Sequence, residues 1–420
     1  MTIQKVHRIL GYLSGAPRVS TRPEAAASGP RSHMLGVMRA FERLGWEVQQ
    51  FIVGDQVPLS WVTKEADVEL SSSYAKRLIA DLARLGMAVA NRFLAVWKVR
   101  QVDWVYERFG AFQFLGYGFQ RRGIPWILET NGLFFNEAIK DRSTLALASI
   151  ERHLEIWAYK QADVIISVTD ELKSLLIRHG INPQKILVVP NGVDIEYFNP
   201  ERFQSEVQHL LSQHRRPIIG FVGTLVTWQG LDLLIQAIAD LRSEGLDYNL
   251  VVVGDGPMRA YWEQLARELG IYDRIKFLGR VPGDKVPSYI AGFDLTFSGQ
   301  VILSSGEMYH SPLKLYEYMA MGKPVVASAF TDAKRLVREG KTGYLFEPGN
   351  LEDLKRVLRQ AYAEQEAWPE MGKKARAEVV AKHSWEARVR EMVPKIEAIL
   401  EAKYGTPYPA RRGNGPGKYD

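Results

Sequence analysis

The chain has 420 residues, with 46% hydrophobic residues, 54 Lys and Arg against 48 Asp and Glu, and no cysteine. This is the composition of a globular protein long enough for two or three domains, and the lack of cysteine excludes disulfides, thiolate zinc sites and thiol nucleophiles. Because no uncharged apolar run approaches the roughly 20 residues of a membrane span, and His7 and Arg8 interrupt the apolar run nearest the first residue, we expect a cytoplasmic protein.

The net charge of +6 is concentrated in the first hundred residues, which hold 14 basic and 8 acidic side chains. A basic surface of this kind can meet anionic lipid or phosphate-bearing substrates. An ordinary solvated surface gives the same count, and we favour it slightly. Peripheral contact with an anionic membrane, at its inner face, therefore stays open.

The first half of the chain alternates apolar strands with amphipathic helices. A strand over 6–13, a loop rich in Gly, Pro and Ala over 14–29, a helix over 32–43 and a strand over 48–53 form a βαβ unit, which implies parallel pairing. Further helices are predicted over 78–100, 112–122, 143–160 and 170–179, and further strands over 104–109, 125–129, 164–168 and 186–190. The helix over 78–100 has basic residues among its apolar ones, and a packed helix is favoured over one lying on a membrane.

A polar linker over 201–216 separates this half from a second run of the same pattern. The second run begins at 217–223, and strands are predicted over 250–253 and 275–278. The segment 294–298 leads into the stretch from 304, and helices are predicted over 231–244, 350–366, 370–383 and 385–402. The last residues are rich in Gly, Pro and Arg and are predicted to lack regular structure.

The stretch from 304 to 328 is the most informative. A polar loop ends at Ser311, Pro312 is suited to open a helix, and Gly322 is suited to end it before a buried strand. The unpaired N–H groups and the dipole make such a helix N-terminus a natural phosphate site. Lys314 lies in the first turn, where a positive charge is unfavourable unless an anion binds there, and Glu317 follows one turn later on the same face. An ordinary loop–helix–strand unit would give the same spacing.

The run Ser311-Pro-Leu-Lys-Leu-Tyr-Glu-Tyr-Met-Ala-Met-Gly-Lys-Pro-Val-Val-Ala-Ser resembles the donor-binding signature of the family 4 retaining glycosyltransferases, which have the GT-B fold. The resemblance implies that Glu317 holds the ribose of a nucleotide-sugar. It also implies that the backbone from Ser311 and Pro312 through Leu313 to Leu315 lies near the diphosphate and the sugar. Most members of the family have a second glutamate eight positions upstream of Glu317, and this chain has Tyr309 there. In this departure the chain resembles a branch of the family that carries Ser-Pro-Leu-Lys.

Other segments of the second half extend the resemblance. In most relatives an arginine and a lysine stand at the positions of Thr224 and Gln229 and contact the diphosphate. Both are lost here, and Lys314 is the replacement charge that we expect. The resemblance adds to the donor site Gly223, Gly254 and, at the nucleobase, Arg280 and Val281.

The first half resembles the family less closely. The run Ser28-Gly-Pro-Arg-Ser-His, which contains Gly29 and ends at His33, is similar to a glycine loop that touches the diphosphate and the acceptor. Glu129 and Asn131 follow a strand at the edge where ligands bind in open parallel sheets, near the place where many relatives have a histidine. A capping and turn cluster is the alternative for these two residues. Lys314, Glu129, Asn131 and His33 are the candidate catalytic residues.

The resemblance implies an α/β protein of the GT-B type, with two Rossmann-like α/β/α domains facing across a central cleft. The expected division is an acceptor domain over 1–200, a nucleotide-sugar domain over 201–384, a crossover helix packing back on the first domain over 385–403 and a tail over 404–420.

The implied function is transfer of a sugar from a nucleotide-diphosphate sugar to a glycan, glycolipid or small-molecule acceptor, with retained configuration. The resemblance implies no metal and no cofactor apart from the donor substrate. No nucleic acid is expected, because aromatic residues are scattered at core spacing rather than interleaved with basic ones. Two alternatives remain. A catalytically inactive nucleotide-sugar-binding subunit would explain Thr224, Gln229 and Tyr309, and a GT-B nucleotide-sugar epimerase would need no acceptor.

Overall fold

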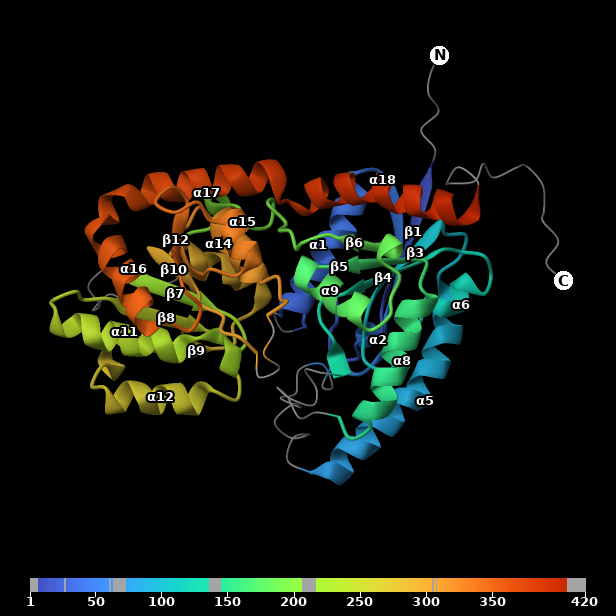
Figure 1. Cartoon of the computed structure of the whole chain (residues 1–420), viewed down its shortest axis with the longest axis horizontal. Helices are drawn as coiled ribbons and strands as arrows, with labels where there is room; N and C mark the ends of the chain where they lie inside the picture. The colour runs from blue at the N-terminus through green and yellow to red at the C-terminus, as the bar shows by residue number, and fades with distance from the viewer. Residues whose placement is uncertain are drawn as a thin grey trace, which may run out of the picture.

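Two parallel six-stranded sheets, each between layers of helices, lie side by side in the computed structural model (Figure 1). The structure describes residues 7–25, 28–59, 62, 73–135, 145–205, 217–303, 306 and 308–405. The predicted α/β architecture with two Rossmann-like domains is confirmed. No helix within these ranges is long and apolar enough to cross a bilayer.

The N-terminal sheet has the strand order β2-β1-β3-β4-β5-β6, so the chain changes direction at β1. Its strands are β1 (Arg8–Ser14), β2 (Trp46–Ile52), β3 (Trp104–Arg108), β4 (Trp126–Thr130), β5 (Val164–Ser167) and β6 (Ile186–Val188). Every residue of β3, β4 and β5 is buried, as expected for parallel strands covered on both faces. The helices of this domain are α1 (Gly29–Arg43), α2 (Val53–Gln56), α5 (Tyr74–Lys98), α6 (Tyr117–Gln120), α8 (Ala148–Gln161) and α9 (Asp170–Arg178).

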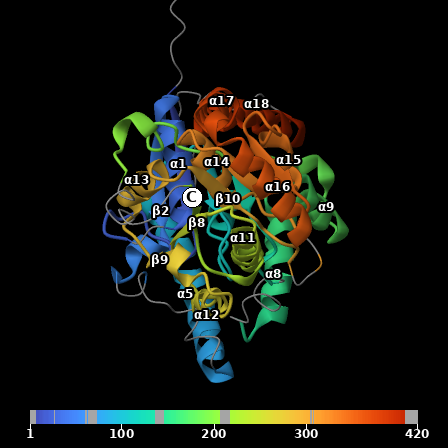
Figure 2. The same cartoon turned by 90° about the vertical axis from the view of Figure 1, so that its left-hand side faces the viewer.

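The C-terminal sheet has the order β12-β11-β10-β7-β8-β9, which reverses between β7 and β10. Its strands are β7 (Ile218–Val222), β8 (Asn249–Val253), β9 (Ile275–Gly279), β10 (Leu295–Ser298), β11 (Val325–Ser328) and β12 (Gly343–Phe346). Its helices are α11 (Leu231–Ser243), α12 (Arg259–Glu268), α13 (Val286–Ala291), α14 (Leu313–Ala320), α15 (Thr331–Leu336), α16 (Leu351–Ala363) and α17 (Trp368–Lys382). Helices α11, α12 and α16 pack on one face and α13, α14, α15 and α17 on the other (Figure 2). A reversal in strand order opens a crevice at the carboxyl ends of the strands, where ligands of such sheets bind.

Helix α18 (Trp385–Tyr404) follows α17 along the top of the molecule and lies over the N-terminal domain (Figure 1). Its apolar side, including Trp385, packs with α1 on the same face of the N-terminal sheet. A Cβ at Gly36 of α1 would come within 2.2 Å of the Trp385 indole, so a larger residue there would push the two helices apart. The hydroxyl of Tyr404 donates a hydrogen bond to Asp163 over 2.7 Å. Tyr404 therefore belongs to α18 and not to the predicted tail, of which residues 406–420 lie outside the described ranges.

The predicted helix over 112–122 is wrong: only α6, Tyr117–Gln120, is helical there. The buried carboxylate of Glu107 accepts hydrogen bonds from the amides of Leu115 and Gly116 at 2.9 and 2.8 Å. These bonds hold the preceding segment in a turn. The helix predicted from residue 143 starts at Ala148, and residues 136–144 are outside the described ranges, as is most of the predicted linker.

Candidate functional site

The N-termini of α1 and α14, one from each domain, lie next to each other. A Cβ at Gly29 would lie 3.4 Å from Leu313, and the hydroxyl of Ser32 donates a hydrogen bond to Oε1 of Glu317 over 3.2 Å. Ser28 caps α1, and Pro312 caps α14 with an extended backbone, so Pro312 precedes the helix that it was predicted to open. The positive dipole ends of two helices therefore meet at the domain junction.

Lys314 is buried at this junction and crosses from α14 to the loop after β7. Its Nζ donates a hydrogen bond to Oε1 of Gln229 over 2.6 Å and lies 3.8 Å from the ring centroid of Phe221. A Cβ at Gly223 would lie 2.9 Å from the same Nζ, so a larger residue there would have to displace the amine. Burial lowers the pKa of Lys314 to about 7, with the carboxylate of Glu317 acting in the opposite direction. An anion bound here would favour the protonated amine.

Glu317 is the second ionisable group of the junction. Burial raises its pKa to about 7, while the hydrogen bond from Ser32 and the charge of Lys314 act to lower it. A lysine and a glutamate on one face of α14 therefore titrate in the same pH range. A ligand that places negative charge beside Lys314 and hydroxyl groups beside Glu317 would favour the charged form of both.

Three glycines shape the loops at the carboxyl edge of β7, β8 and β9. Gly223, Gly254 and Gly279 have φ of 154°, 137° and 73°, in a region that L side chains rarely adopt. The amide of Gly254 donates to the carbonyl of Gly279 over 2.8 Å, and a Cβ at Gly254 would lie 1.9 Å from the carbonyl oxygen of Gly223. The three loops therefore touch, and Gly223 brings them to Lys314.

The side chains of the remaining predicted donor residues form no hydrogen bond with Lys314 or Glu317. Thr224 and Arg280 are exposed, and Val281 is half-buried against the apolar cluster under α14. The hydroxyl of Ser311 donates a hydrogen bond to Asp332 and accepts one from the amide of Asn191 at 3.1 Å. A role of Ser311 toward a ligand would therefore fall to its backbone.

The structure brings together His33, Glu129 and Asn131, but in the interior. Nε2 of His33 lies 2.8 Å from Oε1 of Glu129, which also accepts from Asn131 over 2.8 Å, and Tyr106 donates to Oε2 over 2.5 Å. Burial would raise the pKa of Glu129, but the nearby His33, Arg108 and Tyr106 together lower it to about 2. Both His33 and Glu129 are at most 2% exposed, so this cluster reaches a ligand through the placement of α1.

Tyr309, at the position of the missing second glutamate, is buried against the N-terminal domain. It joins an apolar cluster that runs from the N-terminal sheet to Trp228 and Leu303 of the second domain. The hydroxyl of Thr169 donates to the carbonyl of Tyr309 over 2.9 Å. In this structure Tyr309 is part of the contact between the domains.

Sequence reasoning missed two polar residues of the junction, Ser32 and Arg31. Arg31 lies in the first turn of α1, its Nη2 donates to the carbonyl of Arg22 over 3.1 Å, and its Nε makes no hydrogen bond within the described ranges. Burial lowers the pKa of Arg31. The available signal was its position: Arg31 stands in the first turn of α1 as Lys314 does in α14.

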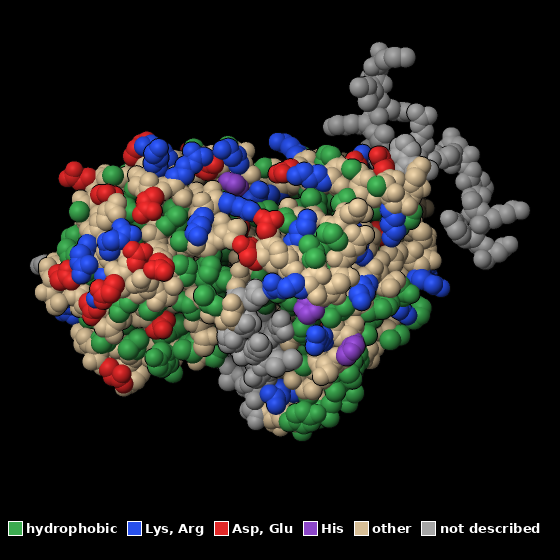
Figure 3. Space-filling view, viewed as in Figure 1, with side chains coloured by type: hydrophobic (Ala, Val, Ile, Leu, Met, Phe, Trp, Pro, Cys, Tyr) green, Lys and Arg blue, Asp and Glu red, His purple; other side chains and the backbone are tan. Residues whose placement is uncertain are grey.

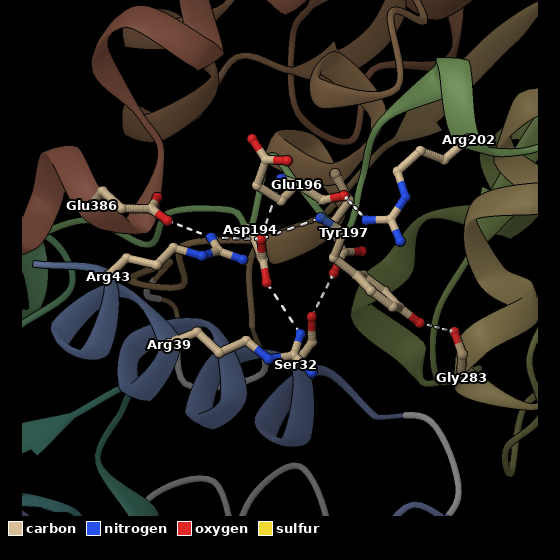
Figure 4. A network of polar contacts seen from close by, with 10 residues as sticks. Ser32, Arg39, Arg43, Asp194, Glu196, Tyr197, Arg202, Gly283 and Glu386 are labelled. Carbon is tan, nitrogen blue, oxygen red and sulfur yellow. Dashed lines mark hydrogen bonds and ion pairs between the residues drawn. The ribbon is translucent and has the colours of Figure 1, made fainter. Parts of the chain in front are cut away.

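Figure 4 shows the polar network beside this junction. Arg39 and Arg43 of α1 contact the two carboxylate oxygens of Asp194 at 3.1 and 3.0 Å, and Arg43 also pairs with Glu386 of α18. Asp194 belongs to the segment that connects the domains, so the network attaches this segment to α1 and α18. Among the residues described, no group of three or more His, Asp and Glu side chains could hold a metal ion.

Family models match both domains. Residues 27–197 match the model described as Glycosyltransferase Family 4, and residues 203–378 the model described as Glycosyl transferases group 1. Each domain thus matches a glycosyltransferase family model, in each case over less than half of the chain.

Among curated relatives, 2-deoxystreptamine glucosyltransferase of Streptomyces kanamyceticus is 30% identical over 213 residues, 49% of this chain and 53% of that protein. D-inositol 3-phosphate glycosyltransferase of Geodermatophilus obscurus is 29% identical over 251 residues, 57% of this chain and 54% of that protein. The chain thus spans little more than half the length of these relatives.

Solved structures of the same fold cover nearly the whole chain. HepE of Anabaena, in complex with UDP and glucose, has a TM-score of 0.67 at 17% identity, over 93% of this chain and 100% of that one. Sucrose-phosphate synthase from Thermosynechococcus elongatus has a TM-score of 0.66 at 17% identity, over 94% and 100%. At this identity the comparison shows the fold, which is GT-B.

Proposed function

We propose that the protein is a retaining glycosyltransferase that moves a sugar from a nucleoside-diphosphate sugar to a glycan, glycolipid or small-molecule acceptor. The observation that carries the proposal is the buried Lys314, bonded to Gln229 between the N-termini of α1 and α14. A cation and two helix ends in one place form a site for a diphosphate. The curated relatives named above are glycosyltransferases, which agrees with this assignment.

In the proposed reaction, the bond between the anomeric carbon and the diphosphate oxygen breaks, and the nucleoside diphosphate leaves with the electron pair. The acceptor hydroxyl oxygen bonds to the anomeric carbon on the same face of the sugar, and its proton passes to an oxygen of the departing diphosphate. Lys314 and the amides of α14 would stabilise the charge that grows on the leaving group. Glu317 would accept hydrogen bonds from the ribose hydroxyls.

The acceptor would bind from the N-terminal domain. The contact between His33 and Glu129 lies under α1 and would set the position of its N-terminus, which carries Ser32 toward Glu317. Removing that pair would therefore move the donor site indirectly. The proposal includes no resident cofactor and no bridging metal, so turnover should survive EDTA. We place the reaction in the cytoplasm.

The testing experiment incubates the purified chain with labelled UDP-, GDP- and ADP-sugars, alone and with candidate acceptors. Thermal shift chooses the donor, because binding to the folded state raises its apparent stability. UDP-glucose is tried first, since HepE was solved with UDP and glucose. Transfer of label to an acceptor supports the proposal. A donor that binds without turnover indicates an inactive subunit, and an isomerised donor indicates an epimerase.

A further inference from the structure

Helix α5 packs on the N-terminal domain through one side only. Ala88, Asn91 and Ala95 face the interior, whereas five large apolar side chains on the opposite side are between 55% and 69% exposed. These five are Ile79, Leu82, Val89, Phe93 and Trp97. Their spacing of three, seven, four and four residues places them on one face of the helix. In Figure 3, apolar side chains gather at the lower edge of this domain, where α5 begins in Figure 1.

The charged side chains of α5 that are not buried are all basic. The helix contains five basic residues and a single acidic one, Asp81. Asp81 is fully buried and pairs with Arg84 over 2.6 Å. At the end of the helix the guanidinium of Arg100 lies 5.7 Å from the ring centroid of Trp97. The apolar row therefore has cations beside it and no exposed carboxylate of its own helix.

A groove of about 340 Å³ adjoins the apolar row between α5 and α6. Its walls are Phe93, Val96 and Tyr117, and its charges are the guanidinium groups of Arg92, Arg121 and Arg122. No acidic residue lines the groove, and none of these three arginines forms an ion pair with a carboxylate of the described residues. Arg92 instead lies 5.4 Å from the ring centroid of Phe93 and 6.0 Å from that of Tyr117. Guanidinium groups bind phosphate through paired hydrogen bonds, so three arginines without carboxylate partners give the groove the chemistry that a phosphate ligand needs.

We propose that the outer face of α5 and the arginine groove together dock on the surface of a bilayer that contains anionic phospholipid. The apolar row would enter the boundary between headgroups and acyl chains, as amphipathic helices with Trp, Phe and Leu on one side do. The arginines would bind the lipid phosphates beside it. The charge argues against a second copy of the chain as the occupant, because a two-fold contact places the same cationic face on itself.

This inference does not depend on the proposed function, since docking needs neither donor nor acceptor. If both hold, the acceptor domain lies at the membrane, and the acceptor class is a lipid-linked one. That consequence rests on the proposed function.

The test is co-sedimentation of the full chain with vesicles of phosphatidylcholine, alone or with phosphatidylglycerol as the anionic lipid. Binding should require the anionic lipid and fall as NaCl is added. Arg121→Gln with Arg122→Gln should weaken binding about 25-fold, since each basic residue near such a surface contributes about fivefold. Phe93→Ser with Trp97→Ser should abolish binding. Lys373→Gln with Lys374→Gln on α17 removes the same charge from the other domain and should leave binding unchanged.

Thermal melting of each variant checks that the fold is kept, and light scattering gives the oligomeric state. Equal binding to neutral and anionic vesicles, no binding to either, or variants that bind as the unchanged chain does would each overturn the proposal. Self-association that is lost in the Phe93 and Trp97 variant would overturn it in favour of a dimer.

Discussion

The amine of Lys314 and the side-chain oxygen of Gln229 lie 2.6 Å apart and join helix α14 to the loop after β7. The resemblance to the family places a basic residue at the position of Gln229, and this chain has its cation on the facing helix. Because of this hydrogen bond, the side chains at positions 314 and 229 reach the same point of the junction. A basic residue at either position could therefore place its charge beside the same diphosphate.

Lys314→Met should retain the fold and lose about 10²–10³ in turnover, because one preorganised group for the leaving charge is removed. Methionine keeps much of the buried volume without the amine. The measurement is the rate of sugar transfer at saturating donor, with melting temperature as the check on folding. Lys276→Met, on an exposed position of β9, is the control. A wild-type rate in Lys314→Met would reject the role of the lysine.

The exchange Lys314→Gln with Gln229→Lys should recover part of the lost turnover. Each single change breaks the bond differently: Lys314→Gln leaves no cation, and Gln229→Lys places two amines together, which destabilises the fold. The double variant restores one amine and one amide at the same contact. Donor affinity by calorimetry and transfer rate are measured on all three variants. If the double variant is no better than Lys314→Gln, the two positions do not share the diphosphate.

Much of this arrangement could be predicted from local sequence. The strands are continuous apolar runs, and Gly322, with φ of 66°, follows the end of α14 as expected. Contacts between distant segments could not be predicted. The bond from Ser32 to Glu317 joins residues 285 positions apart. The helix predicted over 112–122 is wrong for the same reason, because the carboxylate of Glu107 on β3 holds the amides of Leu115 and Gly116 in a turn.

Helix α5 illustrates a second limit. Its periodicity predicted an amphipathic helix, and the structure has one over Tyr74–Lys98. The pattern favoured packing of its apolar residues against the domain. Instead small and polar residues, such as Ala88 and Asn91, face the interior, and large apolar ones such as Phe93 face outward. Periodicity gives the faces of a helix, whereas the neighbouring elements decide which face is covered.

Donor affinity should depend on pH with a maximum near neutrality. The protonated form of Lys314 binds a diphosphate, so affinity falls as pH rises above its pKa of about 7. The ionised form of Glu317 accepts ribose hydroxyls, so affinity falls as pH drops below its pKa of about 7. Since the two groups interact, the two apparent values belong to the pair. Calorimetry with nucleoside diphosphate from pH 5.5 to about 9 should show both limbs.

Each limb of that profile has a matched variant. Lys314→Met should remove the alkaline limb and Glu317→Gln the acid limb, each with weaker binding at the optimum. Ser32→Ala removes a hydrogen bond to Glu317 without removing a charge, and should keep both limbs. A flat profile for the unchanged chain would show that neither group titrates on binding.

Because of the buried pair of His33 and Glu129, the free energy of unfolding should depend on pH in the acid range. Burial opposes the ionised form of Glu129, but its neighbours hold its pKa at about 2, below the 4.5 of an ordinary glutamate. The folded state therefore favours the ionised carboxylate, and this stabilisation is present above pH 4.5 and is lost as pH falls toward 2. Glu129→Gln should cost about 3–5 kcal/mol at neutral pH, because His33 and Arg108 keep their place without the charge that they face. Its free energy of unfolding should then fall less steeply than that of the unchanged chain between pH 4.5 and 2.

The surface pair of His7 and Glu47, also 2.8 Å apart, provides the control. The pKa of Glu47 is lowered too, by hydrogen bonds from Gln49 and His7, but the pair is exposed. Glu47→Gln should therefore change unfolding little at any pH, because exposed ion pairs contribute little. Chemical denaturation at several pH values measures both variants against the unchanged chain. We also expect Glu129→Gln to lower the transfer rate, because a displaced α1 would carry Ser32 away from Glu317. If Glu129→Gln instead changes neither unfolding nor transfer, as expected of Glu47→Gln, the interior pair does not support α1.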